Sequence, residues 1–265
     1  MILPSNIPNP RKYGDSPYTT VVIHGGPGAP GEAAPVAREL SKLTGVLEPL
    51  QTKASVDGQV EELTAMIQQH CNGPVTLIGH SWGAWLAYIT AARNPNLVKK
   101  LILVSSGPLE EAYALTLRDT RLSRLPEEDE YEVRMIEEEL PKPDRHGKYH
   151  LLERMAGLLA KADTFDGLRT EKEIITIQPD VAHYVWKEAS RLRKSGELLR
   201  YADKIKCPVL AVHGDYDSHP AEGVRIPLTM VLNDFRFILL EHCGHYPWNE
   251  RQARDAFFDI LRKEI

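Results

Sequence analysis

The sequence predicts an α/β fold, a mostly parallel sheet flanked by helices, and three observations lead to this prediction. Short apolar runs alternate with helical patterns over residues 18–104 and again over residues 207–263, and such alternation is typical of βαβ units. Between these two parts, helical patterns, charges and prolines occur without a convincing strand. The hydrophobic content of 42% is sufficient for one sizeable core. A single core interrupted by a helical insertion is therefore expected.

Each predicted strand in the first half is a short run of β-branched or aliphatic residues, as expected for strands that are buried on both faces. The clear strands cover residues 18–24, 75–78 and 101–104, and a weaker candidate covers residues 46–50. Apolar residues at helical spacing, such as Val60, Leu63 and Ile67, predict helices between the strands. These helices cover residues 32–43, 56–71 and 82–93.

The alternation returns after Cys207. Strands are predicted over residues 209–212 and 235–240, and helices over residues 221–231 and 250–263. The pattern as a whole predicts a core domain made of residues 1–108 and 200–265. Residues 109–199 are predicted to form a helical cap, inserted after the third clear strand.

The charge balance is mildly acidic, with 32 Lys and Arg, 37 Asp and Glu, and a net charge of −5. Nucleic-acid binding requires a basic surface, so no nucleic-acid partner is expected. No apolar stretch approaches the length of a membrane span, and residues 1–10 lack the apolar run of a signal peptide, so no membrane partner is expected. The sequence does not indicate an oligomeric state.

Neither the cysteines nor the histidines predict a metal site. Cys71, Cys207 and Cys243 are odd in number and form no C-x-x-C pair, which fits reduced thiols and a cytoplasmic localisation. His146 and His150 could share a helix face, but the glycine between them and the lack of a third ligand nearby favour surface histidines. No metal and no cofactor are therefore expected.

A nucleophile is predicted where the second clear strand meets the following helix. The residues there are Gly79-His80-Ser81-Trp82-Gly83, a G-x-S-x-G pattern in the strand–turn–helix context of a nucleophile elbow. Only glycine before and after leaves room for the strand and the helix to approach closely. The helix that begins after Ser81 directs its N-terminal dipole at a developing oxyanion. Ser81 is therefore the candidate nucleophile.

A glycine-rich turn, His24-Gly25-Gly26-Pro27-Gly28, follows the first clear strand. It is either a tight connection or one side of an oxyanion hole. In the second interpretation the backbone N–H groups of Gly26 and Trp82 receive the oxyanion. His24, which opens the turn, is a candidate substrate-binding residue.

The acid and the base each have two candidates. Asp215 and Asp217 follow the strand at 209–212, and His242 and His245 follow the strand at 235–240. Either aspartate could instead be a solvated turn residue. The order Ser, Asp, His, each just past the carboxyl end of its own strand, matches a serine hydrolase on an open α/β sheet. The residues alone leave both choices open.

These motifs resemble the α/β-hydrolase superfamily, over residues 17–108 and 200–265. HGGPG together with GHSWG looks most like its proline iminopeptidase branch. The resemblance implies that the acid is the Asp of a G-x-x-D turn, Asp217, and that the base is the His of a G-H turn, His245. Three features depart from that branch: a short or absent opening hairpin, His80 where the branch usually has glycine, and the segment that follows Val104.

The predicted cap contains an acidic run at residues 127–139. Val133, Ile136 and Leu140 lie at helical spacing, so the glutamates could be the solvated face of a cap helix. Alternatively, they bind the α-amino group of a peptide substrate. The candidates for that role are Glu137, Glu138 and Glu139.

The function predicted from these residues is that of a serine hydrolase. It cleaves a small ester or amide, from a small-molecule or short-peptide substrate, through a Ser-His-Asp triad and an acyl-enzyme. One alternative is a proline iminopeptidase-type aminopeptidase. Others are a C–C bond hydrolase or lyase with the same triad, and a non-enzymatic protein that binds a small ligand.

Overall fold

The sheet is mostly parallel, and its central strands are those with continuous apolar sequence. The computed structural model describes residues 7–140, 148–168 and 175–265. The strand order is β1-β3-β2-β4-β5-β6-β7, and only β1 runs antiparallel to its neighbour. The strands are β1 Arg11–Tyr13, β2 Tyr18–Ile23, β3 Gly45–Glu48, β4 Val75–His80, β5 Val98–Val104, β6 Val209–Gly214 and β7 Phe235–Leu240.

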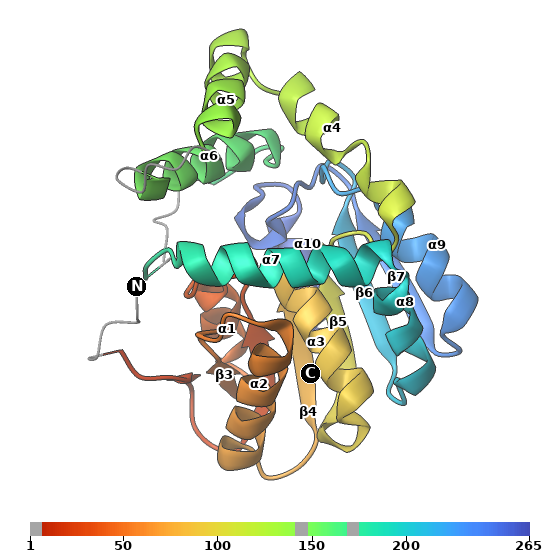
Figure 1. Cartoon of the computed structure of the whole chain (residues 1–265). Helices are drawn as coiled ribbons and strands as arrows, with labels where there is room; N and C mark the ends of the chain where they lie inside the picture. The colour runs from red at the N-terminus through yellow and green to blue at the C-terminus, as the bar shows by residue number, and fades with distance from the viewer. Residues whose placement is uncertain (1–6, 141–147, 169–174) are drawn as a thin grey trace.

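Helices cover both faces of the sheet (Figure 1). One core cluster joins the sheet to α2, α3, α7 and α9, and a second joins the other face to α1 and α10. This arrangement confirms the predicted α/β class. The bounds are α1 Ala34–Leu40, α2 Val56–His70, α3 Trp82–Arg93, α7 Pro179–Lys194, α9 Glu222–Val231 and α10 Arg254–Glu264.

Helix α3 is the most deeply buried helix of the core, and its sequence explains why. Eleven of its twelve residues, Trp82 to Ala92, are buried, and a helix that is apolar all round has to lie inside the protein. By contrast, α2 is amphipathic and begins at Ser55, whose hydroxyl accepts a hydrogen bond from the Gly58 N–H and thus caps the helix. The helix that follows Ser81 is therefore anchored along its whole length.

The segment between β5 and β6 contains five α-helices within its described residues. They are α4 Leu117–Ser123, α5 Glu127–Glu139, α6 Lys148–Ala162, α7 and α8 Glu197–Arg200. In Figure 1, α4, α5 and α6 stand above the sheet while α7 crosses directly over it. The described part of this segment contains no strand and only the isolated bridge between Gly167 and Glu250. The domain boundaries predicted at residues 108 and 200 remain a prediction.

The predicted core elements are present, with ends that shift by a few residues. The helix predicted from residue 250 begins at Arg254, because residues 247–249 form a 3₁₀ turn and the chain is extended at Glu250. Strand β1 was not predicted. It is a three-residue edge strand of charged and aromatic residues, so it lacks the apolar run by which a buried strand is recognised.

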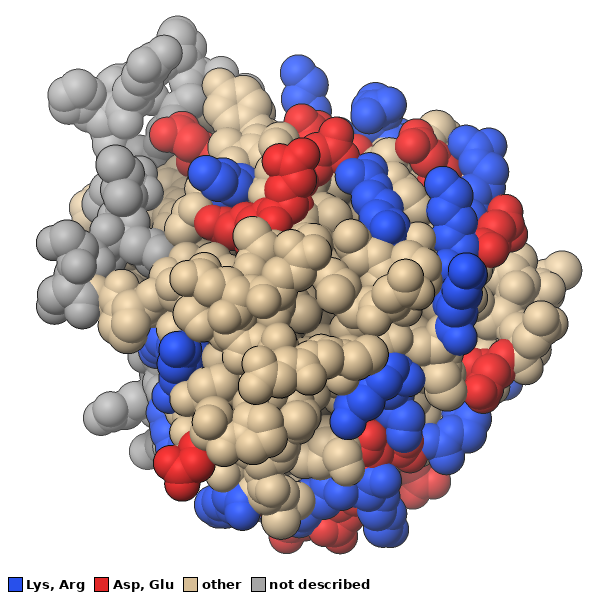
Figure 2. All heavy atoms as spheres, turned by 90° about the horizontal axis from the view of Figure 1, so that it is seen from below, with Lys and Arg blue, Asp and Glu red and all other residues tan. Residues whose placement is uncertain are grey.

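The surface carries charges of both signs. Figure 2 shows the face seen from below, where lysine and arginine lie beside aspartate and glutamate around an uncharged centre. In the described part of the chain, none of the helices combines the length and apolar character that crossing a bilayer requires.

Candidate active site

Ser81 lies in a strained turn between β4 and α3. Its backbone has φ 52° and ψ −116°, a conformation that L-residues adopt only when the surroundings impose it. A Cβ on Gly79 would overlap the Gly83 carbonyl oxygen, and a Cβ on Gly83 would overlap the His24 carbonyl oxygen. The two glycines therefore allow the close approach of strand and helix that the elbow requires.

The Gly26 and Trp82 backbone N–H groups are unused in the described part of the chain. Neither donates a hydrogen bond there. Gly26 has φ 41°, a left-handed conformation that favours glycine. It lines the same cavity as Ser81. Two free N–H groups beside a nucleophile are what an oxyanion hole requires.

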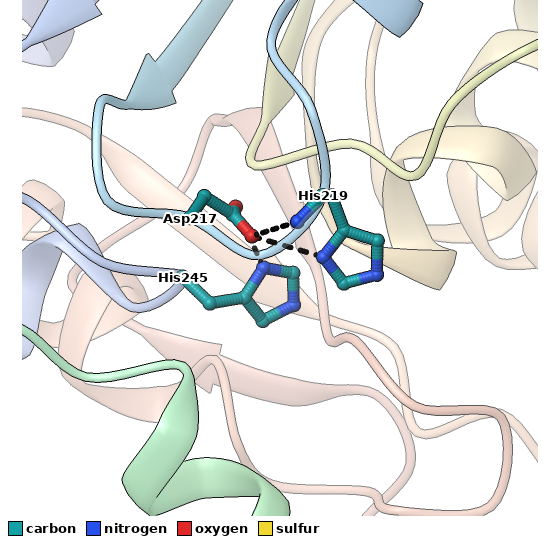
Figure 3. Close-up of side chains that lie close together, drawn as sticks. All are labelled: Asp217, His219 and His245. Atoms are coloured by element: carbon teal, nitrogen blue, oxygen red, sulfur yellow. Dashed lines mark hydrogen bonds and ion pairs between the residues drawn. The ribbon is translucent and has the colours of Figure 1, made fainter. Parts of the chain in front are cut away.

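Asp217 and His245 are joined by a hydrogen bond. The His245 Nδ1–H donates to the Asp217 Oδ2 at 2.8 Å, and both side chains are buried (Figure 3). Asp217 comes from the loop after β6 and His245 from the loop after β7. Both therefore lie at the carboxyl edge of the sheet, where Ser81 follows the end of β4.

The buried pair shifts both protonation equilibria. Burial alone would lower the pKa of His245, but the Asp217 carboxylate more than offsets this and raises the His245 pKa above its ordinary value of 6.5. Burial alone would raise the pKa of Asp217. Three neighbouring imidazoles, led by His245, instead hold that pKa well below its usual range. The carboxylate is therefore ionised at neutral pH, beside a histidine that binds protons readily.

Asp215 and His242, the other candidates for the acid and the base, lie outside the cavity that contains Ser81. Asp215 is exposed and accepts a hydrogen bond from the Cys243 N–H at 3.0 Å, so it stabilises the histidine loop from outside. His242 is exposed, has φ 53°, and packs its ring against Phe165. Neither residue lines the cavity that contains Ser81.

Comparison with known proteins identifies the family. A model described as the alpha/beta hydrolase family matches residues 20–260. The chain belongs to the alpha/beta hydrolase family. The superfamily inferred from the motifs is thus confirmed, whereas the proline iminopeptidase branch remains a prediction. No curated protein matches the hydrolase in sequence.

Solved structures with the same fold are distant in sequence. VinJ is 19% identical, with 96% of this chain and 93% of that one covered and a TM-score of 0.67. A 2-hydroxy-6-oxo-6-phenylhexa-2,4-dienoate hydrolase from Rhodococcus sp. strain RHA1 is 21% identical, with 94% and 91% covered and a TM-score of 0.58. A thioesterase domain from the curacin biosynthetic pathway is 18% identical, with 95% and 93% covered and a TM-score of 0.59. At these identities the likeness concerns the fold.

His80 of the hydrolase connects three parts of the site. Its Nδ1 lies 3.0 Å from the Glu32 Oε2, and its Nε2 lies 2.8 Å from the His245 carbonyl oxygen. The Glu32 Oε2 also accepts the Gly25 N–H at 2.7 Å. Although burial opposes it, the interaction with His80 lowers the pKa of Glu32. One imidazole thus ties the nucleophile elbow to the glycine-rich turn and to the histidine loop.

A buried ion pair supports the histidine loop from the side of the cap. Arg121 on α4 forms a forked contact with Asp163, at 2.9 Å from Nε and 2.6 Å from Nη2. The Asp163 carbonyl oxygen in turn accepts the His245 N–H at 2.8 Å. The fully buried Glu250 accepts the Gly244 N–H at 3.0 Å and further N–H groups after α6.

The sequence patterns did not single out these supporting residues. The only available signal was position: His80 lies inside the elbow motif, and His219 lies two residues after the proposed acid. Glu32, Arg121, Asp163 and Glu250 are ordinary charged residues in sequence, and only the fold brings them to the site.

Asp217 is surrounded by more than one histidine (Figure 3). Its Oδ1 accepts both the backbone N–H and the Nδ1–H of His219, each at 2.9 Å. Asp217, His219 and His245 offer ligand atoms close enough together to hold a metal ion. However, both Nδ1 atoms already bond to the carboxylate, so hydrogen bonding accounts for the cluster.

The other predicted substrate-binding residues are not brought to the cavity. His24 is fully buried, and its ring bonds to the Gly25 carbonyl and the Gln51 N–H. Burial lowers the His24 pKa to about 4, which is the behaviour of a neutral core histidine. Glu137 pairs with Arg118 on the outside of the cap at 2.6 Å.

Glu138 and Glu139 are exposed on α5, and none of the three predicted glutamates lines the cavity. Their proposed contact with a substrate amine therefore gains no support. Of the histidine pair considered for zinc, His150 is exposed on α6, whereas His146 lies outside the described residues.

The cavity above Ser81 has a volume of about 2310 Å³. It extends from the glycine-rich turn to α4, α6 and α7, and its wall includes Trp85 and Trp186, whose rings pack edge to face at 5.8 Å. Much of the remaining wall is aliphatic, including Leu117, Leu152 and Leu159. An apolar wall in the same cavity as Ser81 can accommodate a hydrophobic substrate group.

Proposed function

We propose that the protein is a serine hydrolase that cleaves an ester or amide through Ser81, His245 and Asp217. The observation that carries the proposal is the buried hydrogen bond between Asp217 and His245, at the sheet edge where Ser81 occupies its strained turn. A binding protein has no need for any of these features.

In the proposed mechanism His245 removes the proton of Ser81 as the hydroxyl attacks the acyl carbon. The Ser81 hydroxyl makes no hydrogen bond to any described residue, and such catalytic contacts often tighten only when substrate binds. Asp217 holds the imidazole with Nδ1 protonated, which leaves Nε2 as the base, and stabilises the imidazolium that forms.

The Gly26 and Trp82 N–H groups receive the negative charge of the tetrahedral intermediate. Losing one such donor typically lowers kcat by about 10²–10³-fold. The imidazolium then protonates the leaving group, which departs and leaves the acyl group on Ser81. Water, activated by the same histidine, hydrolyses the acyl-enzyme and restores the serine.

The cavity supports a substrate with a larger acyl group than acetyl. Its volume of about 2310 Å³ exceeds the roughly 300–1,000 Å³ typical of pockets for drug-sized ligands, and the aromatic pair Trp85 and Trp186 borders it. We therefore expect kcat/KM for p-nitrophenyl esters to rise from acetate to medium-chain acyl groups.

The aminopeptidase alternative is less well supported. A substrate ammonium in a partly dry pocket needs a carboxylate partner. The cap glutamates lie outside the cavity. Of the three described carboxylates that line it, Asp163 is paired with Arg121, Glu32 already accepts two hydrogen bonds, and Asp180 in the first turn of α7 is exposed to solvent.

The test is labelling with a fluorophosphonate, followed by peptide mass analysis and a substrate panel. We expect modification of Ser81 alone, and hydrolysis of p-nitrophenyl esters in preference to prolyl-naphthylamide. Absence of labelling would refute a serine nucleophile. Efficient prolyl turnover with negligible ester turnover would establish the peptidase instead.

A further inference from the structure

The carboxylate of Asp217 is shared between two imidazole rings. Its Oδ2 bonds to His245, while its Oδ1 accepts two hydrogen bonds from His219, one from the backbone and one from the ring. The two rings stack with centroids 4.5 Å apart and an angle of 25° between their planes. Figure 3 shows both rings turned toward the same carboxylate.

His219 is held in this position from its other side as well. The His213 Nε2 lies 2.8 Å from the His219 carbonyl oxygen and 3.5 Å from the Asp217 Oδ2. His219 is buried yet lines the cavity. The short segment from Asp217 to His219 is therefore fixed by hydrogen bonds to its backbone and to its side chains.

A second donor on the carboxylate changes how strongly Asp217 acts on His245. Each hydrogen bond to a carboxylate disperses its charge, so the bond from His219 weakens the attraction between Asp217 and a protonated His245. Burial lowers the pKa of His219 to about 4, so its ring is a neutral donor at the pH of catalysis. A protonated His245 lowers the pKa of His219 further, because two imidazolium rings stacked at this distance would repel each other.

Other charged or titratable groups also face this pair of rings, and they come from several elements of the fold. Those groups are His80, Tyr246, Arg121, Asp163, Glu32 and His213. None of them donates a side-chain hydrogen bond to Oδ1. His219 is thus the one side chain, among the described residues, that competes with His245 for the charge of Asp217 through a bond to that oxygen.

We propose that His219 is a positioning residue that orients Asp217 and sets the pH range in which His245 acts as a base. This inference rests on the proposed function of Ser81, His245 and Asp217. By drawing charge from the carboxylate, His219 lowers the proton affinity of His245 and extends activity toward lower pH.

The matched variants are His219→Phe and His219→Asn. Phenylalanine keeps a stacked ring but removes the Nδ1 donor. Asparagine removes the ring but keeps an amide donor near the position of Nδ1. Comparison of the two separates hydrogen bonding from packing. His219→Leu is a second variant without a donor, in case the phenylalanine variant does not fold, and a thermal melt checks each protein.

The readout is the rate of Ser81 labelling by a fluorophosphonate between pH 5 and 9, which requires no knowledge of the substrate. In His219→Phe we expect the acidic limb of the profile to move to higher pH by about one unit, with the plateau rate changed less than tenfold. His219→Asn is expected to keep the wild-type limb.

An unshifted limb in both variants that lack the donor would overturn the proposal. So would an equal shift in His219→Asn, because packing would then be the cause. A uniform loss of rate at every pH would mean a purely structural role. If the wild type is labelled elsewhere than at Ser81, or shows no acidic limb, the proposed triad fails, and the role of His219 fails with it.

Discussion

The two parts of the helical segment between β5 and β6 are held to the protein in different ways. Helix α7 buries Val181, Val185, Ala189 and Leu192 in the same cluster as the central sheet. Helices α4, α5 and α6 instead form a small apolar cluster of their own, made of Leu122, Leu125, Val133, Ile136, Leu158 and Ala162. Helix α7, together with Leu198 of the short helix α8, is continuous with the main core.

The contacts of α4–α6 with the rest of the site are largely polar. Arg121 reaches the histidine loop through Asp163, and Arg124 donates to the Tyr216 carbonyl at 2.6 Å and to the Ser218 Oγ at 3.0 Å. These partners flank His245 and Asp217. We therefore expect the outer helices to affect the alignment of the proposed triad, and α7 to contribute to the stability of the fold.

The largest expected effect is on kcat, and it should come from a change at Ser81, which lies neither in α7 nor in α4–α6. Ser81→Ala should lower kcat by up to about 10⁶-fold, since it removes the nucleophile. The turn is strained and packs little, so the melting temperature should stay the same or rise. The measurements are ester hydrolysis and a thermal melt. Retention of more than a few per cent of wild-type kcat would show that the nucleophile is another residue.

Asp217→Asn should lower kcat by about 10⁴-fold, because an amide favours the wrong tautomer of His245. Asp215→Asn is the matched control two residues away. It only weakens the hydrogen bond to the Cys243 N–H, so its kcat should fall less than tenfold. Comparable losses in both variants would mean that the acid comes from another part of the chain.

Arg121→Gln tests whether the outer helices align the triad. It breaks the buried pair with Asp163, whose carbonyl oxygen holds the His245 N–H. We expect kcat/KM to fall by about 10–100-fold, the cost of a small misplacement of a reacting group. The control is Arg118→Gln on the same helix, which removes an exposed ion pair with Glu137 of little energetic value. Equal effects of the two changes would argue against alignment through Asp163.

Two valine-to-alanine variants, one on α7 and one on α5, test whether α4–α6 unfold separately from the main core. Val185→Ala on α7 should lower the global free energy of unfolding by about 2 kcal/mol, since it leaves a cavity in the main core. Val133→Ala on α5 should instead increase hydrogen exchange in α4–α6 and leave the main transition nearly unchanged. Denaturant titration and hydrogen exchange measure the two quantities. If Val133→Ala lowered the main transition as much, the outer helices would belong to the same cooperative unit.

The smallest expected effect is on the pH profile. His245 must be neutral to act as a base, and the Asp217 carboxylate raises its pKa above 6.5. The value of kcat/KM should therefore rise with pH through a midpoint above 6.5 and then level off. A midpoint clearly below 6.5, or activity that falls over pH 5.5–7.5, would contradict this role of His245.

The sequence by itself determined the strands of the parallel sheet and the positions of the candidate nucleophile, acid and base along the chain. These features are local: a buried strand is a continuous apolar run, and an elbow requires glycine at fixed spacing around Ser81. The sequence could not choose between Asp215 and Asp217 by physical argument, because both follow the same strand. The resemblance to α/β-hydrolases made that choice.

Only the tertiary structure decided which side chains meet. Glu32 and Arg121 carry no local signal, because charged residues in loops and on helices are usually solvated. His219 has only its position, two residues after Asp217. They reach the site through contacts between segments far apart in sequence, as when Arg121 on α4 binds Asp163 after α6.

The glutamates of α5 show the opposite case. Their acidic run was compatible with the solvated face of a helix or with a binding role, and the rotation of α5 on its apolar face turns them away from the cavity. A periodic pattern indicates which face of a helix is buried, but what that face packs against depends on the whole fold.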